Sequence, residues 1–556
     1  MNKKVKAKVK TINRGEELWI EGIWTGSVAF LAGFAGLYFG SMGLFRMGIP
    51  MGFWSSALFI LPALAVCLVM QPGRFGMLIF GAQVLAIAFC ILLALPFHDL
   101  SWDGMAVRQI LVEGVLLRKL CPEVLPSTHL LSAWLGLLGG SVDAGKAANP
   151  LLMICAFGFG LKAVTEAGFQ GLTRWLIALV AAMNPVSIYQ LSSFYLDGAL
   201  ASLISCQLAA FFLVYLKPKH LPFLGSSLFC FLMLCTAKTS GFAYGGILAL
   251  GIMLLLATSR RLALSKIITW HLFLIFLGLA THILERGSGY NWLRLKQQTD
   301  LKTYLYGVGS APDEIRNLNK FQAFLKSHLS PSAVWPNAWE VKFPLVFSRP
   351  ELAVYQDLNP DLRSGGFGPL YGTFLLLACI GSLLVAFQRK IPWQSCVPAV
   401  LVFSTCLLSQ AWWARWVPQA WLIPLLMVVP VLFYCPKGLS EWVSLGSLAV
   451  GLVNSLLILV FYVSGCLENR KLLEGQIQFL KKLPSPVEIW VPDFPSNLTW
   501  LQQEGISFNK LEKEPETPRL KLQRTTSKVD LPKNWRQFLG REQIVESWRK
   551  RGLIED

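Results

Sequence analysis

The stretch FGMLIFGAQVLAIAFCILLALPFHDLSWDG, residues 75–104, contains the pattern that decides the fold of this chain. Residues 75–97 form a nearly unbroken apolar run, long enough to cross a hydrocarbon layer of about 30 Å as a helix. The run is continuous and does not alternate with a period of two, so it predicts a helix and not a barrel strand. Two aspartates, Asp99 and Asp103, follow directly. Carboxylates are costly at the mouth of a membrane span, so this pair indicates chemistry.

The rest of the chain repeats this apolar pattern. Of its 556 residues 54% are hydrophobic and 15% are charged, a composition far from that of a soluble globular domain. We predict an all-α polytopic membrane protein with about thirteen transmembrane helices. The predicted spans are residues 25–45, 53–70, 75–97, 148–167, 173–190, 198–216, 222–236, 241–258, 267–284, 369–387, 393–410, 417–435 and 442–463.

Basic residues in short loops predict the orientation. They lie in the N-terminal segment and in alternate short loops, at Arg74, Lys217, Lys219, Arg260, Arg261, Lys266, Arg389, Lys390 and Lys437. The positive-inside rule places this side, with the N-terminus, in the cytoplasm. The loops 98–147 and 285–368 then face outward, as does everything after residue 463. We therefore divide the chain into a transmembrane domain, residues 1–463, and an outward-facing soluble domain, residues 464–556.

The soluble domain is expected to be a small α/β cap. An amphipathic helix around residues 468–483 precedes a strand at 487–491, and helices follow at 497–504 and 541–550. Asn497-Leu498-Thr499 is a formal glycosylation sequon, a pattern of low specificity.

Charge and cysteine content exclude some other classes. The net charge of +18 includes a basic N-terminal segment, which we interpret as orienting the chain and contacting anionic lipid and not nucleic acid. The 12 cysteines are scattered, mostly within apolar spans, and resemble small hydrophobic residues more than a disulfide framework. No cysteine or histidine cluster has the spacing of metal ligands.

Polar residues gather at the predicted outer ends of the spans. Besides the loop with Asp99 and Asp103, they form four groups: Asn184-Pro185, Tyr195-Leu196-Asp197, Lys238-Thr239-Ser240-Gly241 and Trp412-Trp413-Ala414-Arg415-Trp416. Carboxylates and cations at one membrane interface suit a reaction on an amphiphile whose head lies there and whose tail stays in lipid.

These motifs resemble the GT-C superfamily of membrane glycosyltransferases, of the protein mannosyltransferase and aminoarabinose transferase type. The long outer loop before the last spans and the outer C-terminal cap are also similar to that superfamily. The chain departs from it in having two spans before the one that precedes the acidic loop. The resemblance implies inverting transfer of a sugar from a polyprenyl-phosphate donor to a glycan, lipid or protein acceptor on the outer face. It also implies a multi-pass protein of the cell envelope, in the inner (plasma) membrane of a bacterium.

The resemblance also implies roles for individual residues. Asp103 is the first choice for the catalytic base and Asp99 the second. Lys238 and Arg415 are candidates to bind the phosphate of the donor, with Arg108 as a weaker third. Tyr195 and Asp197 are candidates to line the substrate cleft.

Each of these residues also has a purely structural alternative. Asp103 could cap the following helix, and Asp197 could cap the next span. Lys238 could extend to the interface, and the tryptophans could belong to an aromatic belt. No cofactor is implied. A divalent metal held by Asp99, Asp103 and Asp197 is an alternative, but the second outer loop lacks an Asp-x-Asp pair, so a metal-free mechanism is favoured.

Two other classes of function remain as alternatives. A multi-pass transporter or a flippase for lipid-linked sugars should place ionisable groups near the bilayer midplane, in repeated broken helices. The middles of the predicted spans are nearly free of charge, and no internal repeat is evident. A structural scaffold would not explain why the polar groups gather on one side.

Overall fold

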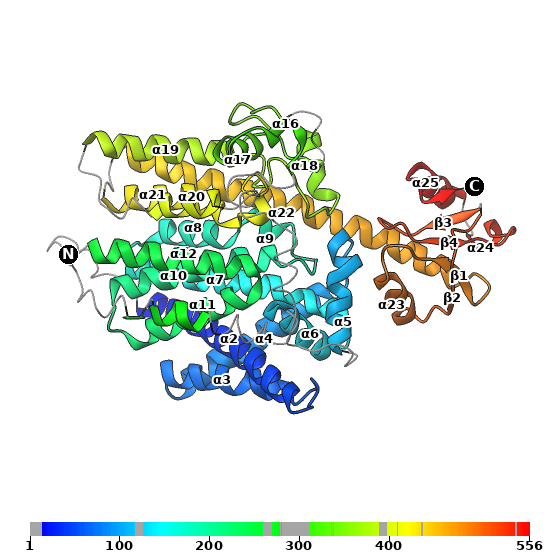
Figure 1. Ribbon diagram of the computed structural model, residues 1–556, viewed down its shortest axis with the longest axis horizontal. Coiled ribbons are helices and arrows are strands. Elements are labelled where there is room, and N and C mark those ends of the chain that lie inside the picture. Colours follow the sequence, from blue (N-terminus) through cyan, green and yellow to red (C-terminus); the bar gives the residue numbers. More distant parts are fainter. Residues whose placement is uncertain are drawn as a thin grey trace.

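The computed structural model describes residues 14–116, 126–258, 269–270, 272–278, 280, 311–334, 336, 339–388, 397–407, 410–434, 438–516, 518–539 and 542–555. Helices dominate these residues. Most of them run side by side in one bundle, and a small sheet lies at the far end of one long helix (Figure 1).

Within the described residues, five helical stretches are long and apolar enough to cross a membrane. They lie in α2 (Arg14–Arg46), α4 (Arg74–Ala94), the 3-10 segment η3 (Val142–Ala147) with α7 (Ala148–Glu166), α10 (Asp197–Leu216) and α22 (Leu439–Leu480). A mostly helical, membrane-embedded chain agrees with the all-α class predicted from the sequence.

Shorter apolar helices lie between these five. They are α3 (Ser55–Met70), α8 (Gly171–Ala182), α11 (Leu221–Ala237), α12 (Thr239–Thr258), α19 (Tyr371–Gln388), α20 (Val397–Cys406) and α21 (Leu422–Tyr434). Every predicted span except residues 267–284 overlaps one of the long or short apolar helices. Of residues 267–284 the structure describes 269–270, 272–278 and 280, and these are helical.

The first two helices approach each other closely because α2 has a glycine at the contact. A Cβ atom on Gly36 would lie 2.4 Å from the backbone oxygen of Leu58 in α3, which no real side chain tolerates. Small residues at helix contacts are the usual means of bringing two backbones together in a membrane, where burial of apolar surface supplies little force.

Ion pairs fasten one end of the bundle, at the start of α2 and the ends of α7 and α10. Lys162 pairs with Glu21 and lies 2.8 Å from Glu166, whose other oxygen is 2.6 Å from Lys217. We call this the inner end, since the sequence predicts it to be cytoplasmic. The side chain of Lys162 is only 6% exposed, and it is paired with a carboxylate on both sides.

Arg174, near the start of α8, belongs to the same inner end. It is buried and pairs with Glu16 at the start of α2. The starts of α2 and α8 and the ends of α7 and α10 thus bring their charged residues to one level.

The opposite, outer end carries short elements that interrupt the connections between spans. They are η1 (Gly104–Arg108), α5 (Gln109–Leu116), α6 (Ser127–Gly139), α9 (Pro185–Ile188), α16 (Asp313–Arg316), α17 (Lys320–His328), α18 (Arg349–Gln356), η5 (Ala414–Trp416) and η6 (Pro418–Trp421). In Figure 1, α5, α6, α9 and α16 to α18 lie on the side of the bundle that faces the sheet. Residues 285–310 of the second predicted outer loop lie outside the described part.

The C-terminal cap is built on the second half of α22, which runs without a break across the predicted boundary at residue 463. The cap contains β1 (Val487–Trp490), α23 (Ser496–Gln503), β2 (Phe508–Leu511), β3 (Arg519–Lys521), β4 (Lys528–Asp530), α24 (Arg536–Leu539), α25 (Glu542–Lys550) and β5 (Ile554–Glu555). The strand order is β2-β1-β4-β3-β5, with only β1 and β2 parallel.

The structure of the cap argues against glycosylation of Asn497 in the predicted sequon. That side chain is only 5% exposed, and its Nδ2 donates a 2.8 Å hydrogen bond to Ser527 Oγ. A buried amide with a partner inside the cap is not accessible to a glycosylating enzyme, so Asn497 has a structural role.

Candidate functional site

Four charged side chains from distant parts of the sequence meet around Arg415 at the outer end. Arg415 Nη1 contacts Asp361 Oδ1, Nη2 lies 3.5 Å from Asp103 Oδ2, and Nε lies 3.9 Å from Asp197 Oδ2. The side chains of Asp103 and Asp361 are 33% and 25% exposed, whereas that of Asp197 is 4% exposed. Solvent therefore reaches the cluster from the side of Asp103 and Asp361. The sequence predicted three of these four residues.

Lys238 and Tyr195 extend this cluster, as the sequence predicted for both. Lys238 Nζ lies 2.6 Å from Asp197 Oδ1 and 4.0 Å from the ring centroid of Trp416. The Tyr195 hydroxyl accepts a 3.3 Å hydrogen bond from the backbone N–H of Asp103, and the Arg415 guanidinium lies 5.2 Å from the Tyr195 ring. Lys238 is thus held by a carboxylate and an aromatic face, so it is not merely extended along the membrane surface.

Several donors beside Arg415 are buried and unused. Within the described residues, Arg415 Nε, Trp413 Nε1, Trp416 Nε1 and Ser240 Oγ have no hydrogen-bond partner. A buried donor without an acceptor costs about 1–3 kcal/mol. Such groups in a native structure are usually satisfied by ordered water or a bound group. Three of these donors belong to Arg415 itself and to the Trp413 and Trp416 rings beside it, so they could serve a ligand with several acceptor oxygens.

The two aspartates of the opening stretch have different environments. Asp99 is 3% exposed, and its Oδ2 accepts a 2.7 Å hydrogen bond from the backbone N–H of Phe194. Its Oδ1 accepts from the backbone N–H of Ser101, at 2.9 Å, and from the Ser101 hydroxyl. Both carboxylate oxygens are therefore occupied in tying this loop to residues 191–197.

Burial raises the pKa of Asp99 to about 6, and the hydrogen bonds from Ser101 and Phe194 oppose that rise. The adjoining Gly104 leaves space for the carboxylate, since a Cβ there would lie 2.0 Å from Asp99 Oδ2. The geometry thus favours a positioning role for Asp99.

Asp103 is the more available of the two. It precedes η1, but its side chain makes no capping hydrogen bond, which excludes the structural alternative considered from the sequence. Instead its carboxylate faces Arg415 and is partly open to solvent. A carboxylate held by a cation and reachable from outside can accept a proton from a bound hydroxyl.

Asp361 and Arg363 were missed in the sequence. Desolvation raises the pKa of Asp361 to about 6, against the attraction of Arg415. Arg363 lies 5.4 Å from the ring centroid of Trp413, while Arg415 lies 4.6 Å from the same ring. Both missed residues belong to a predicted outer loop, so their side of the membrane was foreseeable. No spacing rule connects residues 361–363 with Arg415.

The site thus contains three carboxylates and three cations. The carboxylates are Asp103, Asp197 and Asp361, and the cations are Lys238, Arg363 and Arg415. Arg108, at the end of η1, lies within electrostatic range of Asp197 and of the buried His129 and is more peripheral. Among the residues that the structure describes, no group of three or more histidines, cysteines or acidic residues is arranged to hold a metal ion.

Hydrogen bonds from neighbouring helices hold the segment that carries Arg415. Asn184 Nδ2 donates a 2.9 Å hydrogen bond to the backbone oxygen of Pro418, while its Oδ1 caps α9. The Tyr244 hydroxyl donates to the backbone oxygen of Trp416. The predicted Asn184-Pro185 motif therefore positions the site and does not enter it.

The long helix α22 contacts two of the loops that build the site. Asn454 accepts a 2.8 Å hydrogen bond from the N–H of Leu370 and donates one of 2.9 Å to the oxygen of Phe367, in the segment after Asp361. The Tyr462 hydroxyl accepts a 3.0 Å hydrogen bond from the N–H of Ser192, in the segment before Tyr195.

The cap contacts the acidic loop directly. Trp500 in α23 donates a 2.6 Å hydrogen bond to His98 Nε2, and His98 Nδ1 lies 2.7 Å from Asp143 Oδ2. The rings of Trp102 and Phe494 meet edge to face with centroids 4.7 Å apart. The residues that flank Asp99 are therefore fixed from the side of the cap as well as from the bundle.

Comparison with models of known protein families finds no match, and no curated protein is similar to the chain.

Proposed function

We propose that the chain is an integral membrane glycosyltransferase of the GT-C type, with about thirteen spans. It would transfer a sugar, with inversion, from a polyprenyl-phosphate donor to a glycan, lipid or protein acceptor on the outer face of a bacterial inner membrane. The observation that carries this proposal is the set of unused donors around Arg415 beside a half-open carboxylate, Asp103.

The acceptor hydroxyl must lose a proton as it attacks the anomeric carbon. Asp103 is the proposed base, because its carboxylate is both accessible and oriented. Asp99 is assigned a positioning role, since both of its oxygens are already used. Tyr195 and Asp197 would shape the cleft through their contacts with Arg415.

The leaving group is a lipid phosphate, whose developing negative charge needs fixed cations and N–H donors. Arg415, Lys238 and Arg363 would supply the charge, and the indole N–H groups of Trp413 and Trp416 would supply further donors. No protein metal ligand is required in this scheme.

Charge balance requires one change on donor binding. Three carboxylates already neutralise three cations, so an incoming phosphate must replace one of them. Asp361 is the proposed carboxylate to be displaced, because burial raises its pKa to about 6 and so favours its protonated, uncharged form. We therefore expect the donor phosphate to occupy the position at Arg415 that Asp361 now holds.

The positions of the ion pairs along the bundle favour an enzyme over a transporter. The ion pairs formed among the described residues of the bundle lie at its inner and outer ends. A pump or flippase would need such groups near mid-membrane.

The test uses full-length protein in lipid nanodiscs with a panel of radiolabelled polyprenyl-phosphate sugars. Asp103→Asn should lower turnover by about 10²- to 10⁴-fold while leaving the melting temperature nearly unchanged. Asp313→Asn, which alters an aspartate with a side chain 86% exposed on α16, is the matched control and should retain wild-type turnover. Full turnover in Asp103→Asn would refute the base assignment, and no turnover of any lipid donor by wild type would refute the class.

A further inference from the structure

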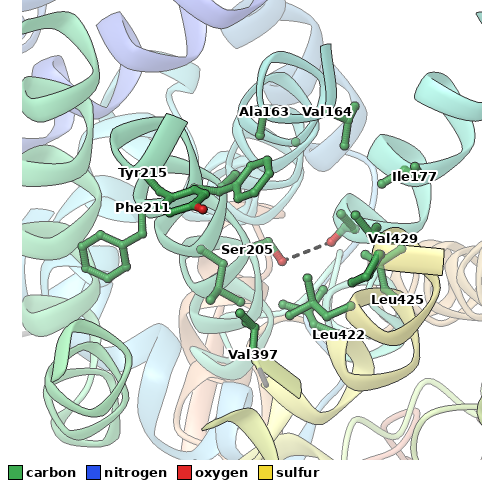
Figure 2. A pocket seen from close by; sticks show the side chains of 17 residues that line it. Ala163, Val164, Ile177, Ser205, Phe211, Tyr215, Val397, Leu422, Leu425 and Val429 are labelled. Atoms are coloured by element: carbon green, nitrogen blue, oxygen red, sulfur yellow. Dashed lines mark hydrogen bonds between the residues drawn. The ribbon is translucent and has the colours of Figure 1, made fainter. Parts of the chain in front are cut away.

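A cavity of about 180 Å³ lies within the bundle, away from the Arg415 cluster. It is bounded by α7, α8 and α10 on one side and by α20 and α21 on the other. Figure 2 shows the side chains of Ala163, Val164, Phe211, Leu422 and Val429 around it. Small residues on α7, α8 and α10, among them Gly160, Ala181 and Ala209, leave the space open.

The lining is almost entirely apolar. Ser205 is its main polar member, and the Ser205 hydroxyl already donates to the backbone oxygens of Ala181 and Ala201, each at 3.1 Å. A buried water needs two to four polar partners, which this lining does not offer. An apolar cavity of about 150 Å³ in another protein stays dry and takes up hydrocarbon-like ligands. The lining therefore favours a hydrocarbon ligand over water.

The position of the cavity in the bundle indicates what kind of hydrocarbon ligand could reach it. On α7 the lining ends at Val164, two residues before Glu166, and on α10 it ends at Tyr215, two residues before Lys217. Both helices end there at the inner side of the bundle. The cavity thus extends from the middle of the bundle to its inner end, whereas Arg415 lies at the outer end.

A basic turn adjoins this inner end of the cavity. Lys217 and Lys219 follow α10 directly and are exposed. The side chain of Lys217 is 54% exposed but also lies 2.6 Å from Glu166, so a headgroup there would share Lys217 with that carboxylate and meet Lys219 as well. Lysines at a membrane surface attract anionic lipid headgroups, at about 1 kcal/mol per residue. The apolar cavity suits the acyl chain of an anionic phospholipid, and the adjoining lysines suit its headgroup.

We propose that the cavity holds an acyl chain of an anionic phospholipid whose headgroup lies at the Lys217–Lys219 turn. This bound lipid is separate from the sugar donor, and it fills a space that would otherwise separate α20 and α21 from α7, α8 and α10. The site does not depend on the proposed glycosyl transfer.

The experiment uses wild-type protein in nanodiscs that contain phosphatidylglycerol with a diazirine near the end of one acyl chain. After irradiation, mass spectrometry of the digested protein locates the labelled residues. We expect label on the cavity lining, and about a tenfold weaker signal when the same chain is carried by phosphatidylcholine. A third arm carries the diazirine on polyprenyl phosphate.

Two kinds of variant test the binding of the lipid's acyl chain and the binding of its headgroup separately. Ala163→Leu fills the cavity and should abolish the label, and the milder Ala209→Val should weaken it. Ala88→Leu adds the same bulk at an exposed position of α4 and should change nothing. The double variant Lys217→Gln/Lys219→Gln should remove the preference for phosphatidylglycerol. The pair Lys510→Gln/Lys513→Gln, at exposed positions in the cap, is its charge control and should keep that preference.

Three outcomes would overturn the proposal. They are equal cavity labelling in wild type and in folded Ala163→Leu, labelling by the polyprenyl probe alone, and no labelling of the lining by any probe in wild type. Melting curves identify variants that fail to fold. If a variant does fail, the labelling pattern of the wild-type protein still tests the proposal by itself. Sugar transfer is not measured, so failure here leaves the proposed function untouched.

Discussion

The two ends of the bundle use similar charged residues in different ways. At the inner end, Lys162 on α7 and Arg174 on α8 pair with Glu21 and Glu16 of the long helix α2. At the outer end, Arg415 lies on a three-residue 3-10 segment and meets aspartates on loops and at helix starts. Charges on long helices fasten those helices together. The charges on the short segments at the outer end lie beside buried donors without partners, and these features favour a binding role over a fastening one.

The largest expected effect comes from the same substitution made at each end. Arg415→Gln leaves three aspartates without their shared cation, and Arg174→Gln leaves Glu16 alone. Removing one partner of a buried ion pair costs up to about 3–5 kcal/mol, and less where the remaining carboxylate is exposed, as Glu16 is. Both variants should therefore melt at lower temperature, Arg415→Gln by more. Only Arg415→Gln should also lose turnover per folded molecule, by about 10²- to 10³-fold. Nanodisc assays at a temperature where both variants are folded make the measurement. Equal turnover losses would remove the distinction between the ends.

The next effect is a dependence of stability on pH. The pKa of Asp361 is raised by desolvation to about 6, so the folded state disfavours its ionised form. Ionising Asp361 therefore destabilises the folded state. This destabilisation is absent below the ordinary pKa of an aspartate and reaches its full value above pH 6. Asp361→Asn should therefore stabilise the protein by about 2–3 kcal/mol at pH 8, and this advantage should shrink as the pH falls from 6 to 4.

Melting temperatures of wild type and Asp361→Asn, measured between pH 4.5 and 8, test this expectation. Asp313→Asn is the control on an exposed aspartate, and its difference from wild type should stay nearly constant. A constant difference for Asp361→Asn as well would show that Asp361 is ionised in the fold at every pH tested.

A smaller effect is expected from the two lysines. Lys238→Gln removes a cation from the proposed phosphate site, so the KM for a lipid-linked donor should rise about tenfold. Lys162→Gln removes a cation from the inner end and should lower the melting temperature without changing KM. Initial rates over a range of donor concentrations distinguish the two, and an unchanged KM in Lys238→Gln would exclude Lys238 from donor binding.

The smallest effect belongs to the contact between the outer end and the cap. Trp500→Phe keeps the aromatic packing against His98 and removes the indole N–H that His98 Nε2 accepts. One such hydrogen bond is worth about 1 kcal/mol. Hydrogen exchange of residues 98–104 should increase modestly, and exchange at the inner end should stay as in wild type. Faster exchange at both ends would show that the cap stabilises the whole bundle.

The sequence predicted much of this architecture because hydrophobic runs carry their own length and period. The predicted apolar ranges overlap apolar helices from α2 to α22, although only five helical stretches among the described residues are long enough to span a membrane. In the cap, β1, α23 and α25 lie close to their predicted positions. The strands β2 to β5 were missed because they are two to four residues long and carry no clear alternation. Their pairing depends on contacts across the sheet.

The site was predicted in part for a related reason. Asp103, Asp197, Lys238 and Arg415 stand out because each interrupts an apolar end. Asp361 lies in a polar loop, where one more carboxylate carries no signal. Asp99 and Asp103 look alike in the sequence, and only the bonds from Phe194 and Ser101 reveal that Asp99 is used structurally.

The helix α22 has a mechanical consequence. Its 42 residues amount to a rod of about 63 Å, anchored in the bundle at one end and in the cap at the other. Along its length it is bonded to the segments that precede Tyr195 and follow Asp361. A tilt of the cap relative to the bundle would therefore act through one rigid helix on both of these segments at once.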